Sequence, residues 1–108
     1  MIDDVLKLGT RVHAIPVVHG SGDFAWELRR LMLSERHDCL AVPLPASFQT
    51  AVERGVGELP RLSVAYQREF GWAAADGPAG SENTVSFVPI DPCQPIIAAI
   101  RLAQEERI

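Results

Sequence analysis

The sequence predicts an α/β fold: a three-layer, Rossmann-like arrangement in which a mostly parallel sheet is joined by helical crossovers. Two patterns along the chain predict it. Apolar, β-branched segments typical of strands alternate with segments of helical periodicity. The run at 39–42 is apolar throughout, which is typical of a strand buried on both faces of a parallel sheet. Helices that connect such strands act as right-handed crossovers.

In the first half of the chain the predicted elements alternate between helix and strand. A short amphipathic helix is expected before Gly9, which is placed to end it. The three elements that follow are a strand over Arg11–Val18, a helix over Asp23–Arg36 and a buried strand over Cys39–Val42.

The second half continues the pattern with a helix that begins at Ser47 and ends before Pro60. A strand over 62–67, a long loop over 68–83 and a strand over 84–90 are expected next. The last helix is predicted to start with Asp91 as its N-cap residue. No Gly or Asn follows this helix, so we interpret residues 1–108 as a single α/β domain that is the N-terminal portion of a longer protein.

Composition and charge narrow the class of protein. The chain has 108 residues, of which 47% are hydrophobic and 22% charged, as in one globular domain. No apolar run approaches the ~18 residues of a membrane span, and the acidic start lacks a signal-peptide profile. We therefore expect a cytoplasmic protein. A net charge of −4 argues against nucleic acid or an anionic membrane as the main partner.

The predicted sheet places the candidate functional residues in three loops. Ligands bind at the carboxyl ends of parallel strands, where loops 19–22, 43–47 and 91–94 would meet. His19 is the candidate catalytic base, because an imidazole can move a proton near neutral pH. A small polar or anionic ligand would be bound by the residues around it, which are Gly20, Ser21, Gly22, Ser47, Asp91 and Cys93.

Other chemistries receive less support from the same residues. Residues 20–25 fit the dinucleotide pattern G-x-G-x-x-A, but the second strand ends in Val42-Pro43 without the acidic residue that binds the ribose. The G-K-[ST] of a P-loop and cysteine–histidine clusters with zinc spacing are absent from the sequence. We therefore predict no cofactor and no metal. Cys93 would lie at a helix N-terminus, where a thiol is more reactive.

Two segments resemble a known superfamily. VVHGSGDFAWELRRLMLSERHDCLAVPLPASF is similar to the first strand, turn, helix and second strand of TraB, ChaN and erythromycin-esterase-like proteins. VSFVPIDPCQPIIAAIRLAQEERI resembles a later strand and helix of its uncharacterised bacterial members. The resemblance implies an α/β fold and a hydrolytic activity that uses His and Glu residues, sometimes with a metal. His19 matches the histidine of the first turn, whereas Pro43 stands where the resemblance implies a Glu.

Three functions remain open from the sequence. The first is a degenerate or partial hydrolase-like domain in which His19 activates a water molecule. The second is a non-catalytic interaction or oligomerisation module, with the 71–80 loop and the last helix packing on a second copy or on further domains. The third is an α/β-hydrolase fragment, because a His-Gly turn is typical of the oxyanion loop although no G-x-S-x-G is present.

Overall fold

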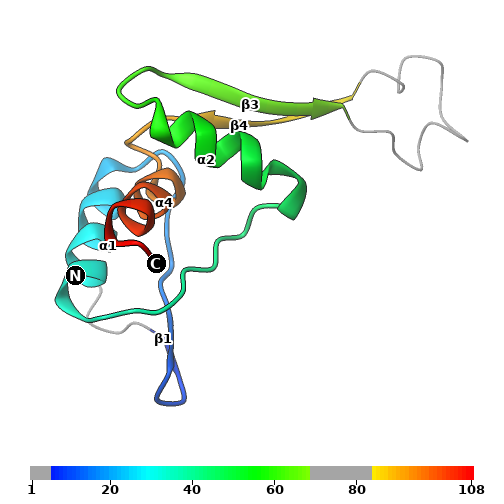
Figure 1. Cartoon of the computed structure of the whole chain (residues 1–108). Coiled ribbons are helices and arrows are strands. Elements are labelled where there is room, and N and C mark those ends of the chain that lie inside the picture. Colours follow the sequence, from blue (N-terminus) through cyan, green and yellow to red (C-terminus); the bar gives the residue numbers. More distant parts are fainter. Residues whose placement is uncertain (1–5, 69–83) are drawn as a thin grey trace, which may run out of the picture. The chain divides into compact units, whose positions relative to one another are not determined.

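The computed structural model describes residues 6–68 and 84–108, and in these ranges it contains short antiparallel strand pairs and three α-helices (Figure 1). In chain order the elements are β1 (Leu6–Leu8), β2 (Val12–Ala14), α1 (Gly22–Ser34), the 3-10 helix η1 (Ala46–Phe48), α2 (Gln49–Gly57), β3 (Ser63–Arg68), β4 (Val85–Ile90) and α4 (Pro95–Glu106). The chain divides into two compact units, residues 1–43 with 91–108 and residues 44–90.

The predicted three-layer, Rossmann-like fold is wrong. Within the described ranges, β1 pairs only with β2 and β3 only with β4, and both pairs are antiparallel. A parallel sheet requires consecutive strands to pair on either side of a crossover helix. Here each strand pairs with its neighbour in the sequence instead, so no parallel sheet brings the predicted loops to one edge.

The first sheet is a small hairpin where a helix was predicted. Leu6 pairs with Ala14 and Leu8 with Val12, and Gly9 turns the chain between them with φ +70°. That left-handed conformation favours glycine, so Gly9 makes a hairpin turn rather than a helix end. The predicted strand over Arg11–Val18 is reduced to β2, and residues 1–5 of the predicted helix lie outside the described residues.

The run at 39–42 is not a strand. Cys39 and Ala41 are exposed, whereas Leu40 is half-buried and packs on the buried cluster formed by α1 and α4. An apolar run indicates that side chains seek burial but does not supply a partner for the backbone. In this chain the segment buries part of its apolar surface against helices, and Pro43 follows without any ladder.

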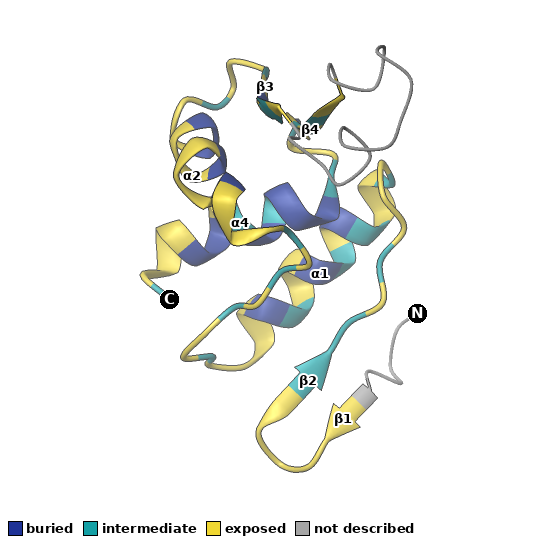
Figure 2. Cartoon of the chain, turned by 90° about the vertical axis from the view of Figure 1, so that its right-hand side faces the viewer, coloured by how far each residue is buried: buried dark blue, intermediate teal, exposed yellow. Residues whose placement is uncertain are grey.

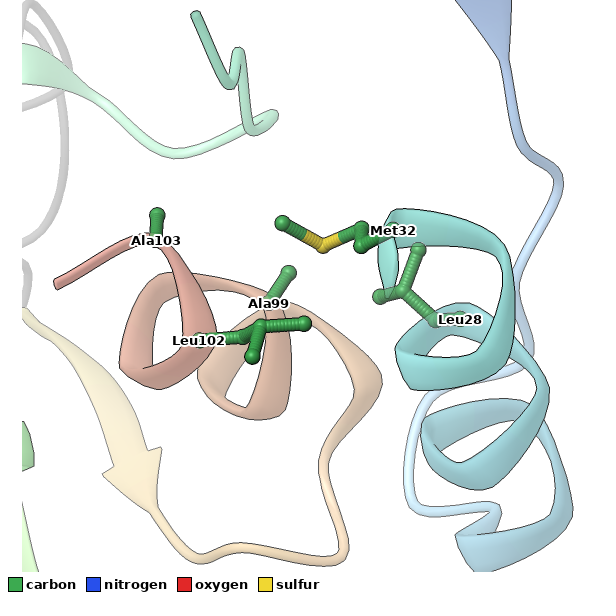
Figure 3. Close-up of a cluster of buried hydrophobic side chains, with 5 residues drawn as sticks. All are labelled: Leu28, Met32, Ala99, Leu102 and Ala103. Atoms are coloured by element: carbon green, nitrogen blue, oxygen red, sulfur yellow. The ribbon is translucent and has the colours of Figure 1, made fainter. Parts of the chain in front are cut away.

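The core of the first unit lies between α1 and α4. Figure 3 shows Leu28 and Met32 of α1 facing Ala99 and Leu102 of α4. All four are buried, as is Ala103 one position further along α4. Figure 2 shows buried residues along both helices, and those of α1 are three and four positions apart, as in an amphipathic helix. The α1 helix was predicted correctly within two residues at its C-terminal end, because its apolar stripe faces this core.

The last helix begins later than predicted. Its N-cap residue is Gln94 and its first residue is Pro95, a position that proline favours because its missing N–H has no partner there. Asp91 instead accepts a 2.8 Å hydrogen bond from the backbone N–H of Cys93 through its carboxylate. The helix ends with Arg107 at φ 58° and with the N–H of Ile108 donating to the carbonyl of Ala103.

In the second unit one face of the β3–β4 ribbon packs against α2. Ala65 and Ile90 on that face are buried, together with Val52 and Val56 of α2. Gly55 permits the close approach, because a Cβ atom there would lie 2.2 Å from Cδ1 of Ile90. Both strands were predicted from the sequence, the first of them from its alternating pattern. Of the predicted loop over 68–83, Arg68 belongs to β3 and residues 69–83 lie outside the described residues.

Candidate functional site

The turn that carries His19 lies beside the start of α4. The backbone N–H of Gly20 donates a 2.8 Å hydrogen bond to Oε1 of Gln94, across 74 residues of sequence. The loops at 19–22 and 91–94 therefore meet, as the sequence predicted. They meet through this hydrogen bond and the packing of α1 on α4, and not at the edge of a parallel sheet.

The structure places the predicted site residues in several elements and in both units. His19 and Gly20 are exposed, and Ser21 is the N-cap residue of α1 without a hydrogen bond from its side chain to the helix. Ser47 lies in η1 of the second unit, and the other six predicted residues lie in the first. Gly22 and Cys93 line a cavity of about 270 Å³ together with the exposed Trp26.

A larger cavity lies elsewhere in the first unit and was not predicted. It measures about 500 Å³ and is lined by the β1–β2 hairpin, by α1 and by the segment after α1. Two of the chain's three histidines, His13 and His37, line it with their ring centroids 5.8 Å apart. Nδ1 of His13 lies 3.5 Å from Oε2 of Glu35, which also lines the cavity. No spacing in the sequence pointed to this cluster, because three separate segments form it.

The β3–β4 ribbon presents an apolar surface on the side away from α2. We call it the ribbon face, and it comprises Val64, Tyr66, Val85, Phe87 and Pro89. Tyr66 and Phe87 are directly opposite each other in the ladder and are 71% and 66% exposed. The alternation that predicted the first of these strands also implied a second face, but the sequence did not indicate that this face is exposed.

The described residues were searched for metal-binding clusters and for membrane-spanning helices. Among residues 6–68 and 84–108, no group of three His, Cys, Asp or Glu side chains is placed to hold a metal ion. None of the helices described there is both long and apolar enough to span a bilayer.

Comparison with protein-family models, curated proteins and solved structures found no match. The resemblance to TraB, ChaN and erythromycin-esterase-like proteins therefore stays a prediction, and the Rossmann-like parallel sheet expected with it is wrong.

Proposed function

We propose that this chain is a non-catalytic interaction module that associates with a second copy of itself through the ribbon face. The observation that carries the proposal is the cross-strand pair Tyr66–Phe87, in which both rings are exposed. Two aromatic side chains at this exposure leave roughly 250 Å² of ring surface in contact with water. Aromatic residues are enriched at protein interfaces, and contiguous apolar patches of this kind mark interaction sites.

The ribbon has two apolar faces, and one of them packs against a helix, which an isolated two-stranded ribbon needs in order to be stable in water. Helix α2 covers one face, where Ala65 and Ile90 are buried. The opposite face is also apolar, because Val64 and Val85 lie on it together with the rings of Tyr66 and Phe87.

The charge distribution favours a second copy as the occupant. Charged residues are depleted in the cores of interfaces, and the centre of the ribbon face holds only apolar and aromatic side chains. Arg68 lies on the same face at one end of the ribbon, opposite Val85. Two copies related by a twofold axis through the Tyr66–Phe87 pair would place their arginines at opposite ends, so no like charges meet.

Sedimentation velocity of the whole chain tests the proposal. We expect a concentration-dependent dimer for the natural sequence and a monomer for Tyr66→Ser/Phe87→Ser, because central aromatic residues dominate interface energies at about 2 kcal/mol or more each. Trp26→Ser is the matched control, since Trp26 is 70% exposed but lies on α1, and it should leave the dimer intact.

Two results would overturn the proposal. The first is that the natural sequence stays monomeric at a protein concentration roughly ten times above the micromolar range in which interfaces of standard size associate. The second is a dimer that survives the double substitution. A monomer whose Tyr66 is shielded from a soluble fluorescence quencher would show that another part of the chain covers the ribbon face, which also contradicts self-association.

The hydrolase-like alternatives lack a comparable supporting observation. His19 is exposed and does not line the 500 Å³ cavity, and Pro43 occupies the position where the resemblance implies a carboxylate.

A further inference from the structure

The cavity between the β1–β2 hairpin and α1 joins an apolar floor to a cationic rim. Its floor includes Leu28 and Met32 of the α1–α4 core, and the half-buried Ile15 and Leu40 pack against that core. At about 500 Å³ the cavity falls within the size range of small-molecule sites, which combine apolar walls with a few placed polar groups.

Basic side chains dominate the charged lining although the chain as a whole is acidic. Three of its ten Lys and Arg residues line the cavity, which are Lys7, Arg11 and Arg30, against one acidic side chain, that of Glu35. With 14 acidic residues in the chain, an arbitrary surface would hold more acids than bases. The rim therefore has a local charge opposite to that of the whole protein, and such a patch attracts anions.

The hydrogen bonds and ion pairs of the structure show which cations are available to a ligand. Nε of Arg30 donates to Glu27 at 3.1 Å, and Glu35 faces His13. In the described residues, the side chains of Lys7 and Arg11 form no ion pair or hydrogen bond. Lys7 is opposite His13 in the hairpin ladder, so both side chains project from the same face of the hairpin.

We propose that this cavity binds a small organic monocarboxylate with an apolar body, its carboxylate held by Lys7 and Arg11. The basic side chains of the lining outnumber its one acidic side chain, that of Glu35, so the cavity favours an anion. The floor of Leu and Met side chains matches an alkyl or aromatic body, and Met adapts to irregular ligands. Arginine and lysine together supply charge-assisted hydrogen bonds that a neutral or cationic ligand cannot accept. The site lies in the first unit and does not depend on the ribbon face.

Octanoate is the probe, and 1-octanol and octylammonium are its neutral and cationic analogues. Binding is followed by NMR through the Met32 methyl resonance and the imidazole resonances of His13 and His37. We expect saturable shifts of these signals with a Kd on the order of a few millimolar or tighter, the value usual for a ligand of this size. The neutral analogue should bind several-fold more weakly, and the cationic analogue should produce no saturable shift.

Two variants separate charge from shape. Lys7→Gln/Arg11→Gln should weaken octanoate binding roughly tenfold, because both charge-assisted contacts are lost. Arg54→Gln/Arg61→Gln is the matched control, since it removes the same charge from exposed positions in the second unit and should leave the Kd unchanged. Ala41→Trp places a ring at the cavity wall and should abolish binding while keeping every charge. The amide spectrum of each variant establishes that it is folded.

The proposal fails if octanoate gives no saturable shift, or if octylammonium binds as tightly as octanoate. It also fails if the Lys7/Arg11 variant is folded and retains the Kd of the natural sequence. Shifts centred on Tyr66 and Phe87 instead of Met32 would place the probe on the ribbon face and would exclude the cavity as the carboxylate site.

Discussion

The backbone N–H of Gly20 donates to Oε1 of Gln94, and this 2.8 Å hydrogen bond joins two residues that are 74 positions apart. Gly20 has φ +76°, a left-handed conformation that glycine adopts without strain. Gln94 is the N-cap residue of α4, but its side chain accepts from Gly20 and not from its own helix. The bond therefore connects the turn that enters α1 to the helix on which α1 packs.

Loss of this hydrogen bond should destabilise the first unit. Gln94→Leu removes the acceptor, and we expect the free energy of unfolding to fall by about 1 kcal/mol. Gln94→Glu retains a carboxyl oxygen at the same position and adds a negative charge at a helix N-terminus, which the helix dipole favours. The two variants should therefore differ in urea denaturation followed by circular dichroism. Equal stability of both would show that the side chain does not hold the turn.

Two glycines of α2 should respond to alanine in opposite directions. A Cβ atom at Gly55 would lie 2.2 Å from Cδ1 of Ile90, whose side chain is 2% exposed and has little room to move. Gly55→Ala should therefore cost about 1–3 kcal/mol in spite of its better helix propensity. No atom lies within 4 Å of a Cβ placed at Gly57, so Gly57→Ala should stabilise the helix by up to about 1 kcal/mol. Thermal unfolding of both variants compares them directly, and Ile90→Val should recover part of the loss in Gly55→Ala.

Ser63 should be replaceable by alanine without loss of stability. Its hydroxyl oxygen is buried and has no hydrogen-bond partner among the residues that the structure describes. Burial of an unpaired hydroxyl costs free energy that alanine does not pay, so Ser63→Ala should raise the free energy of unfolding by about 1 kcal/mol. A decrease of similar size in urea denaturation would show that the hydroxyl is paired and would contradict its isolation.

The interface of α1 and α4 should depend on Leu102. This side chain is 2% exposed within the cluster shown in Figure 3, and truncation would leave a cavity there. We expect Leu102→Ala to cost about 2–5 kcal/mol. Leu33→Ala makes the same chemical change at a position on α1 that is 52% exposed, and it should shift stability by less than about 0.5 kcal/mol. Hydrogen exchange of the α1 amides reports the stability of the first unit and therefore measures the effect of each substitution.

Helix α1, strands β3 and β4, and most of α2 and α4 were predictable from local pattern. In each helix the apolar residues recur every three or four positions, and in each strand every second position, so they lie on one face of the element. One such face of each element packs against another element. The start of α4 was placed too early because Asp91 and Pro92 form a valid helix start in isolation. The structure uses that motif for a turn, closed by the bond from Cys93 to Asp91, and begins the helix at Pro95.

The pairing of strands and the composition of the sites were decided by tertiary structure. An alternating or apolar run does not specify which strand it pairs with. The segment at 39–42 was expected to be a strand but packs on helices, and β3 pairs with β4. The 500 Å³ cavity combines residues of a hairpin, a helix and a coil, and the ribbon face is exposed while α2 packs against the opposite face of the ribbon. The sequence by itself determined which residues form most of the helices and the second strand pair, because those preferences act over a few residues. Contacts over long sequence separations depend on how the elements pack, and these decided the sheet topology, the cavity and the apolar face.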